Sequence, residues 1–488
     1  MTLRWVLLLA ALGSPAHAQA QPDDEPAPAP APAPAPVPAP APAPAPAPAA
    51  APASEPAPKP AEELDPFAFG DFTWQSGNAR TKDSKLGNDY FTGEFRLDDV
   101  FHYSFNHPRD HTIGGSTEAW RSGENQVTQL GIGGDFHLDN VQGRLMTQFG
   151  QLSSTTPRND ASPGRGQWQL DNAYRYISEA YGGYHFGDPH RGVNLQAGIF
   201  MSYIGLWSYY NFDNWTYQPS YVSSNTPWFF NGVRLQWFPS DKLKIEPWLI
   251  NGWQSYGMYN SMPGAGGQVR YTPNDRVILI FNQYLIGADI LGAPDRHRFH
   301  TDDSIQVKWY EAKDPHAAIT RIATTLTMDF GCEYGGGVSC NTDTTTATHQ
   351  GTGVLFAGFM AYLRMWHTDR YAWTVGGGAI DNPGRYLVLL PPINGATALS
   401  GTPYFTENPG DPFKAWDTQL SFDYMPSQYF TLRAEVTYRH ASVPYFSGAG
   451  GITPPGGNQG AVGSQVMGWS PDLVQDEPRM TLALLVKM

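Results

Sequence analysis

Between residue 65 and residue 488 the chain repeatedly alternates apolar and polar side chains over segments of about ten residues. Successive side chains of a β-strand point to opposite faces, so this period of two predicts strands with one apolar and one polar face. The clearest segments are residues 193–205, 227–239, 303–310 and 479–488. The last of these runs to Met488. The pattern predicts an all-β fold and argues against a mostly helical body.

Turn signals separate these segments. Short turns are expected at residues 238–243, 271–276 and 424–429, and long polar loops at 153–167, 211–226, 332–352, 383–411 and 447–478. Short turns on the periplasmic side and long loops on the outer side are typical of outer-membrane barrels, so we predict a transmembrane antiparallel up-and-down β-barrel of about 16 strands, with 14 and 18 as alternatives. The candidate strands, the first of which starts at Phe67, are odd in number. Bacterial barrels have an even number, so one candidate must be wrong or one missing.

The first 64 residues have a different composition. Arg4, the apolar stretch 5–12 and Ala16-His17-Ala18 form the pattern of a secretory signal peptide, expected over residues 1–18. That stretch is shorter than the roughly 20 residues of a membrane-spanning helix. Alternating Pro and Ala follow, so residues 19–64 are expected to be a disordered periplasmic tether, and residues 65–488 the barrel. Two roles for the tether stay open: a spacer without a partner, or a link to peptidoglycan.

The composition supports a membrane barrel and excludes one class of partner. The chain has 15 Trp, 25 Tyr and 25 Phe, which suit the two aromatic belts of an outer-membrane barrel. Its formal net charge of -14 argues against nucleic acid as a partner. The expected location is the outer membrane of a Gram-negative cell, with membrane lipid and small hydrophilic solutes as partners. Association into a homo-oligomer stays open.

Both cysteines lie in one glycine-rich segment, at Cys332 and Cys340. The periplasm and the cell surface are oxidising, so we expect a disulfide that closes a small loop. A metal site would need two more soft ligands, and none lies nearby in the sequence. We expect neither a metal nor a cofactor.

A group of short motifs between residues 179 and 253 resembles the OmpL-like putative β-barrel porin family. The motifs are Glu179-Ala180-Tyr181, residues 198–205, residues 213–217 with Ser220, then Pro227, Phe230, Gly232 and Arg234, and finally Asn251-Gly252-Trp253. The resemblance implies an outer-membrane barrel that acts as a channel. One position departs from the family pattern: Trp207 stands where an acidic residue often follows the Ile-Gly pair.

Charged side chains at positions that face the lumen are the candidate pore-lining residues. A charge that faced the hydrocarbon would cost about 2–4 kcal/mol, so these side chains should point inward. They are Arg144, Arg234, Glu246, Lys308, Arg364, Arg433 and Glu435. Rows of opposite charge could sort solutes by charge, or they could simply pair and stiffen the wall. Residues 211–221 mix rings with amides, and either fold into the pore mouth or cap the aromatic belt.

Other constellations have simpler explanations. His300 and Asp302 share a strand face while Asp303 points away, but a polar strand is a better interpretation than a metal site. His102 and Ser104 also share a face, yet no third orienting group can be named for a hydrolase. Glycine runs 264–267 and 376–378 lack the setting of a phosphate-binding loop and indicate bends or close backbone approaches. No enzymatic activity is expected.

The function predicted from the sequence is passive diffusion of small hydrophilic solutes through an outer-membrane porin. One alternative is a structural anchor, in which the barrel is plugged and the Pro/Ala tether spans to the cell wall. A barrel-embedded hydrolase is a weaker alternative.

Overall fold

The computed structural model describes residues 65–82, 84–116, 118–157, 160, 162, 165–258, 260–288, 294–340, 345–346, 349–350, 353–383, 386, 413–454 and 468–488. The expected signal peptide (1–18) and tether (19–64) lie outside these residues, as does most of the expected loop 383–411. Among the described residues, no helix is long and apolar enough to cross a membrane.

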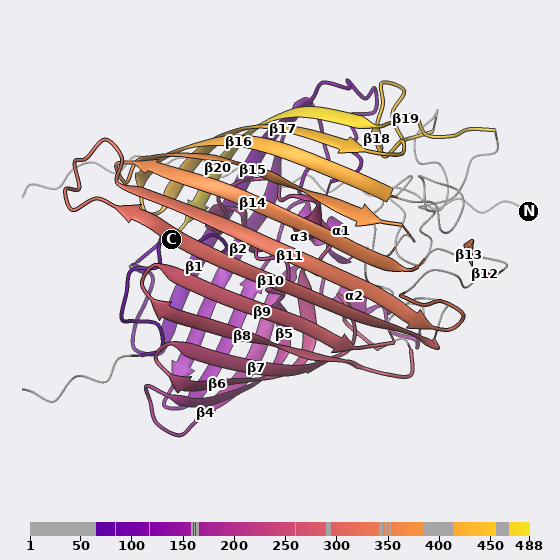
Figure 1. Cartoon of the computed structure of the whole chain (residues 1–488). Coiled ribbons are helices and arrows are strands. Elements are labelled where there is room, and N and C mark those ends of the chain that lie inside the picture. Colours follow the sequence, from indigo (N-terminus) through magenta and orange to yellow (C-terminus); the bar gives the residue numbers. More distant parts are fainter. Residues whose placement is uncertain are drawn as a thin grey trace, which may run out of the picture. The chain divides into compact units, whose positions relative to one another are not determined.

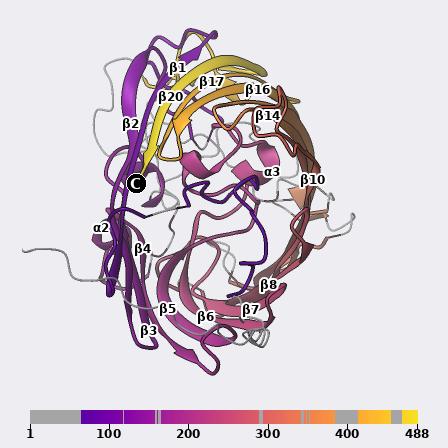
Figure 2. The same ribbon diagram turned by 90° about the vertical axis from the view of Figure 1, so that its left-hand side faces the viewer.

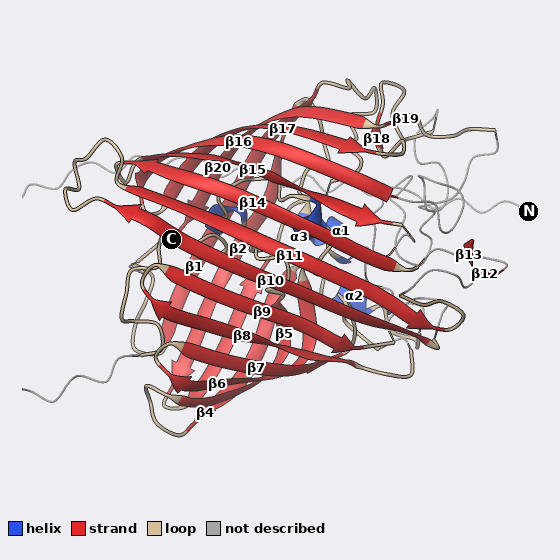
Figure 3. Ribbon diagram, viewed as in Figure 1, coloured by secondary structure: helices blue, strands red, loops and turns tan. Residues whose placement is uncertain are grey.

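The barrel domain is a closed antiparallel ring of sixteen strands (Figures 1 and 3). Each strand pairs with the next along the ring, and β20 pairs with β1 to close it. In ring order the strands are β1 (Phe91–Ser104), β2 (Glu124–Leu138), β3 (Val141–Thr147), β4 (Ile177–Phe186), β5 (Gly192–Met201), β6 (Phe229–Ser240), β7 (Leu243–Ile250), β8 (Gly264–Asn274), β9 (Val277–Ile286), β10 (Arg296–Glu311), β11 (Arg321–Gly335), β14 (Leu355–His367), β15 (Tyr371–Asn382), β16 (Phe413–Ser427), β17 (Phe430–Ala441) and β20 (Asp476–Lys487). The predicted fold class and strand number are confirmed.

The predicted alternation is present in the ring. On β10, Ser304, Gln306 and Lys308 are buried, whereas Ile305 and Trp309 are exposed on the outer wall. On β20, Leu482 is exposed and its neighbour Ala483 is buried. Apolar residues therefore cover the outside of the ring, and the inner wall is mostly polar.

One candidate strand was wrong. The segment that starts at Phe67 forms turns rather than a strand and is not part of the ring. It lies inside the barrel and bonds to side chains and turns of the wall, including a hydrogen bond from the Phe67 N–H to the Asp241 carbonyl (2.7 Å). Its residues Phe72 and Trp74 are buried inside the barrel instead of facing lipid, and Phe67 and Phe69 are partly buried there. Removing this candidate makes the predicted number of strands even.

The two ends of the barrel differ as predicted. Short turns join β6 to β7 at residues 241–242, β8 to β9 at 275–276 and β16 to β17 at 428–429. We call this end, which also carries Met488, the short-turn end. The long connections lie at the opposite end, and they carry the short helices α1 (Leu152–Thr155), α2 (Leu170–Ala173), η3 (Asn211–Asp213) and α3 (Tyr221–Ser224) and the strand pairs β12 (Thr345–Thr346) with β13 (His349–Gln350) and β18 (Phe446–Ser447) with β19 (Leu473–Val474).

Two glycine runs allow bulky rings to lie against the inner wall. A Cβ atom at Gly376 on β15 would overlap the ring of Tyr362, and one at Gly266 on β8 would overlap the ring of Trp248. Tyr362 and Trp248 are both buried. These glycines therefore mark close approaches, which agrees with the structural interpretation of the two runs.

Candidate functional site

The connection between β5 and β6, residues 202–228, folds into the barrel, and we call it the inner loop. Figure 2 looks into the barrel from the short-turn end and shows α3 of this loop within the ring. Thr216, Tyr217, Gln218 and Ser220 are fully buried. Residues 211–221 were expected either to fold into the pore mouth or to cap the aromatic belt, and in the structure they lie inside the barrel. The inner loop is therefore the element that narrows the lumen.

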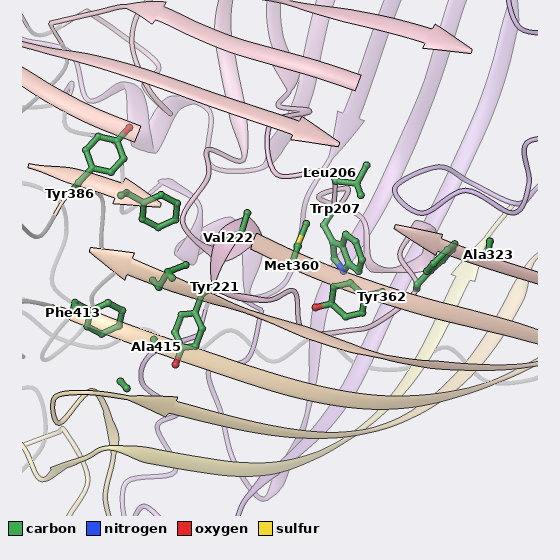
Figure 4. Close-up of a cluster of buried hydrophobic side chains, with 14 of the residues drawn as sticks. Leu206, Trp207, Tyr221, Val222, Ala323, Met360, Tyr362, Tyr386, Phe413 and Ala415 are labelled. Carbon is green, nitrogen blue, oxygen red and sulfur yellow. The ribbon is translucent and has the colours of Figure 1, made fainter. Parts of the chain in front are cut away.

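Apolar contacts hold one side of the inner loop against the wall formed by β11 and β14–β16 (Figure 4). The ring of Trp207 lies 4.7 Å from that of Tyr362 on β14, and the ring of Tyr221 lies 6.2 Å from that of Phe413 on β16. Val222 is fully buried in the same cluster. Trp207, which departs from the family pattern, is thus a packing residue of the loop.

Charged groups of the inner wall bind the backbone of the inner loop. The carboxylate of Glu435 accepts hydrogen bonds from the N–H groups of Tyr217 (2.7 Å) and Gln218 (3.0 Å). The guanidinium of Arg433 donates to the carbonyls of Asn211 (3.2 Å) and Asn214 (2.6 Å). These hydrogen bonds satisfy backbone groups that the loop would otherwise bury without partners.

Arg364 completes this set and shares a carboxylate with Arg433. Its guanidinium donates to the Trp215 carbonyl (3.1 Å) and to Asp423 (2.7 Å). Asp423 also accepts two hydrogen bonds from Arg433, at 2.7 and 2.9 Å. All three side chains are almost completely buried. Arg364, Arg433 and Glu435 therefore fix the inner loop instead of facing open water.

The neighbouring part of the wall also holds the loop, through β1. Arg96 donates to Asp213 of the loop (3.1 Å), and Asp98 accepts from the Asn211 amide (2.8 Å) and from the Tyr217 hydroxyl (3.1 Å). Burial raises the pKa of Tyr217 well above its usual value, so the phenol stays neutral and can donate this hydrogen bond. The loop is therefore bound along one arc of the ring, from β14 to β1.

The other four predicted pore-lining residues also lie on the inner wall and pair with neighbours. Arg144 binds Glu179 (2.6 Å) and Asp135 (3.0 Å). Arg234 lies 3.6 Å from Glu246, and Lys244 lies 2.7 Å from the same carboxylate. Lys308 binds Asp275 (3.3 Å) and Glu311 (2.7 Å). Each charge is offset by a neighbouring group, so the field across the lumen is smaller than separate rows of charge would create.

A second element, residues 65–82, lies in the short-turn end of the lumen, and we call it the N-terminal segment. Trp74 is fully buried, and its indole donates to the Asp275 carbonyl (3.3 Å). The Ser76 N–H donates to the Gln306 side chain on β10 (2.9 Å). The segment also touches the inner loop, because the Trp215 indole donates to the Trp74 carbonyl (3.1 Å).

Cavities of different size adjoin these two elements. A cavity of about 30 Å³ lies beside the inner loop and is lined by residues that include Trp207, Asn211 and Trp228. Hollows of about 550 Å³ and 270 Å³ adjoin the N-terminal segment, and they are lined in part by Arg270 and by Arg321 respectively. The space beside the inner loop is thus much smaller than that at the short-turn end.

The remaining sequence candidates bond within the wall. His300 binds Asp329 (3.1 Å) and Tyr386 (3.0 Å), and Asp302 accepts from Asn282 (2.8 Å). Asp303 points outward, as predicted. In the described part of the chain, no group of three or more His, Cys, Asp or Glu residues is placed to hold a metal ion.

His102 and Ser104 share the inner face of β1 and are both buried. The His102 ring bonds to Thr481 (2.9 Å), and the Ser104 hydroxyl oxygen accepts a hydrogen bond from the Asn106 N–H (3.4 Å). Their observed partners are therefore structural.

A disulfide joins Cys332 to Cys340 and closes a loop at the end of β11.

Several residues of the lumen were missed in the sequence. Asp423 on β16 and Asp98 on β1 are buried on the inner face of their strands, and the alternation alone would have added them. Arg80 and Asp213 lie in connecting segments, where no period reveals which way a side chain points. Arg270 lines the hollow of about 550 Å³ and occupies a lumen-facing position on β8, which the alternation would also have identified.

The family model described as "Putative beta-barrel porin-2, OmpL-like" matches residues 96–467 of the chain. No protein in the search of curated sequences matches it.

Several solved outer-membrane proteins are similar in structure. In vitro folded OmpT of Vibrio cholerae has a TM-score of 0.43 at 9% identity, over 83% of this chain and 99% of that one. The outer membrane channel DcaP of Acinetobacter baumannii has a TM-score of 0.44 at 10% identity, over 83% and 99%. An anion-selective porin from Comamonas acidovorans has a TM-score of 0.44 at 8% identity, over 82% and 99%.

Proposed function

The chain belongs to the OmpL-like putative β-barrel porin-2 family, and from this membership we propose that it forms a narrow outer-membrane channel for passive diffusion of small hydrophilic solutes. The observation that carries the proposal is the closed ring of sixteen strands, whose outer wall is apolar and whose inner wall carries buried charges and amides. A wall of this kind keeps water and polar solutes inside and lipid outside. The short-turn end then faces the periplasm.

The inner loop sets the expected size limit. It is bound to β1, β14 and β17, which belong to one arc of the ring, so a solute must pass beside it. The cavity of about 30 Å³ next to the loop has room for roughly one water molecule. We therefore expect the channel to conduct small ions and to exclude large solutes.

Single-channel recording in a planar lipid bilayer tests this function with the purified, refolded full chain. Discrete conductance steps, with an ion selectivity given by the reversal potential in a salt gradient, are the expected result. Folded protein that inserts and shows no conductance step, both unchanged and with residues 66–80 replaced by a Gly/Ser stretch, would contradict a channel. Correct folding is checked first by the β-sheet circular dichroism signal and by resistance to protease in lipid.

A second function has support from a specific observation. The inner loop and the N-terminal segment both lie within the barrel, as the proposed plugged anchor requires. In that case the residues 19–64 would carry the function as a tether to the cell wall. Deleting residues 22–62 distinguishes the channel from the anchor. A channel still conducts after the deletion. An anchor shows no conductance and loses its effect on the cell envelope.

Processing and cell-wall attachment follow from the same proposal. A signal peptide over residues 1–18 predicts a mature chain that starts at Gln19, which the intact mass of the membrane-extracted protein measures. Attachment of residues 19–64 to peptidoglycan predicts that the chain co-sediments with purified sacculi. No reaction and no cofactor form part of this proposal.

A further inference from the structure

The N-terminal segment crosses the whole diameter of the barrel. Near its start, Phe67 bonds to Asp241 in the β6–β7 turn (2.7 Å). Near its end, Arg80 donates to the carbonyls of Ser427 (2.7 Å) and Phe430 (2.6 Å) at the β16–β17 turn. In the ring order these two turns are separated by eight strands in either direction, β7 to β16 one way and β17 through β20 and β1 to β6 the other. The two anchor points are therefore opposite each other.

Between the two anchors the segment bonds to three strands of one half of the ring. Gln75 accepts from Arg270 on β8 (3.1 Å), Ser76 donates to Gln306 on β10 (2.9 Å), and the Thr73 hydroxyl accepts from Arg321 on β11 (3.3 Å). Figure 2 shows the segment in indigo, crossing the opening of the barrel in front of the inner loop. The segment thus spans the short-turn mouth.

The segment is packed directly onto the inner loop. The Gly77 N–H donates to the Asp213 carbonyl (3.1 Å), and Gly77 has a φ of 79°, a conformation that favours glycine. A Cβ atom at Gly77 would overlap the Leu206 carbonyl oxygen. The chain therefore approaches the loop as closely as a backbone can. The two elements lie in the lumen one behind the other.

The ring does not need this segment to close. β1 pairs with both β2 and β20, and the N-terminal segment contributes no strand to the ring. Its contacts with the wall are hydrogen bonds that involve side chains, together with the packing of the buried rings of Phe72 and Trp74. In the sequence, the Pro/Ala-rich residues directly precede it. The segment can therefore leave the lumen while the barrel stays intact.

We propose that residues 65–82 are a releasable plug, which closes the periplasmic mouth of the channel and opens it when the segment is drawn out through the residues that precede it. This inference rests on the proposed channel function. It assigns the control of conductance to the N-terminal segment and leaves the inner loop as the fixed constriction. The Pro/Ala-rich residues then have a function as well, because they connect the plug to the periplasmic partner that holds them.

The first test replaces residues 66–80 of the full chain with a Gly/Ser stretch of equal length and compares single-channel conductance with the unchanged protein. A severalfold higher conductance or open probability is expected. Equal conductance of the two proteins would overturn the plug while leaving the channel in place. If neither folded protein conducts, the channel itself is refuted. Conductance that appears only after the replacement supports both.

Point variants provide a graded test that does not alter the chain length. Gln75→Ala combined with Arg80→Ala removes contacts with opposite sides of the mouth, and more frequent opening is expected. Asn78→Ala is the matched control, because Asn78 belongs to the same segment and is exposed. Deleting residues 22–60 should leave the conductance unchanged, because nothing in a planar bilayer pulls on the leader.

A thiol reporter measures withdrawal of the plug directly. The two native cysteines are joined in a disulfide, so Ser76→Cys adds the single free thiol of the chain. Ser76 is buried, and a hydrophilic maleimide should label the new thiol slowly in the otherwise unchanged chain and severalfold faster when Gln75→Ala and Arg80→Ala are added. Fast labelling without those two changes would show that the segment does not stay in the lumen and would overturn the proposal.

Discussion

The carboxylate of Glu435, on the inner wall at β17, accepts a hydrogen bond of 2.7 Å from the backbone N–H of Tyr217 in the inner loop. The two residues are 218 positions apart in the sequence. The bond joins a wall residue to the backbone, so it fixes where the loop lies whatever side chain the loop carries at that position. The constriction of the lumen is therefore positioned by the wall.

Glu435→Ala should loosen the inner loop. The substitution leaves the buried N–H groups of Tyr217 and Gln218 without their acceptor, at a cost of about 1–3 kcal/mol in the free energy of unfolding. Noisier single-channel current and faster protease cleavage within residues 202–228 are expected. Glu124→Ala, at the outer end of β2, is the control and should leave both unchanged. Unaltered current noise and cleavage in Glu435→Ala would contradict the anchoring role.

Arg433→Met should destabilise the barrel more than Arg433→Met combined with Asp423→Asn. Arg433 binds Asp423 in a fully buried site, and removing it leaves a carboxylate that Arg364 alone must balance. We expect a loss of about 2–4 kcal/mol for the single variant, because an uncompensated charge is left buried. Urea unfolding in lipid vesicles measures both variants. Strictly additive effects of the two substitutions would refute this coupling.

Arg270→Gln should make the channel more selective for cations. Arg270 lines the hollow of about 550 Å³ at the short-turn end, where it donates to Gln75 and lies against the ring of Phe67 at 4.6 Å. Removing this positive charge lowers the local attraction for anions. The reversal potential in a salt gradient should shift accordingly. Arg191→Gln, exposed in the β4–β5 turn, is the control, and an equal shift there would argue against a specific role for Arg270.

Cys332→Ser combined with Cys340→Ser should loosen one outer loop and spare the barrel. The disulfide closes a loop between positions that are 8 residues apart, so its loss costs at most about 2–3 kcal/mol in the chain-entropy account. Val338, buried within this loop, should become accessible to protease. Limited proteolysis from the outer side and the thermal unfolding temperature measure the two effects. A collapse of the β-sheet signal would show a larger role.

Acid should weaken the N-terminal segment. Burial by itself would raise the pKa of Asp71, but hydrogen bonds from Lys82 and Thr73 lower it to about 2, below its ordinary value of 3.8. A lowered pKa in the folded state stabilises the protein above pH 3.8, and this contribution is lost as the pH falls from 3.8 toward about 2. Open probability should rise over that range, and the rise should be absent in Asp71→Asn.

The sequence by itself determined the strands and their two faces. Alternation is a local property, because each side chain of a strand points away from its neighbours whatever lies elsewhere in the chain. For this reason residues 303–310 already showed Lys308 on the inner face and Trp309 on the outer one. The positions of the short turns and the approximate strand number followed in the same way. The motifs between residues 179 and 253 also indicated the family, through their resemblance to its members.

Only the tertiary structure decided how the lumen is filled. The partners of Glu435 and Arg433 lie more than 200 positions away in the inner loop, and no period in the sequence links them. A strand was expected to start at Phe67, yet the rings of Phe72 and Trp74 in this segment are buried inside the barrel and not in lipid. The pattern of apolar residues in a sequence indicates which side chains are buried away from water. Which surface covers them depends on closure of the ring and on contacts between distant parts of the chain.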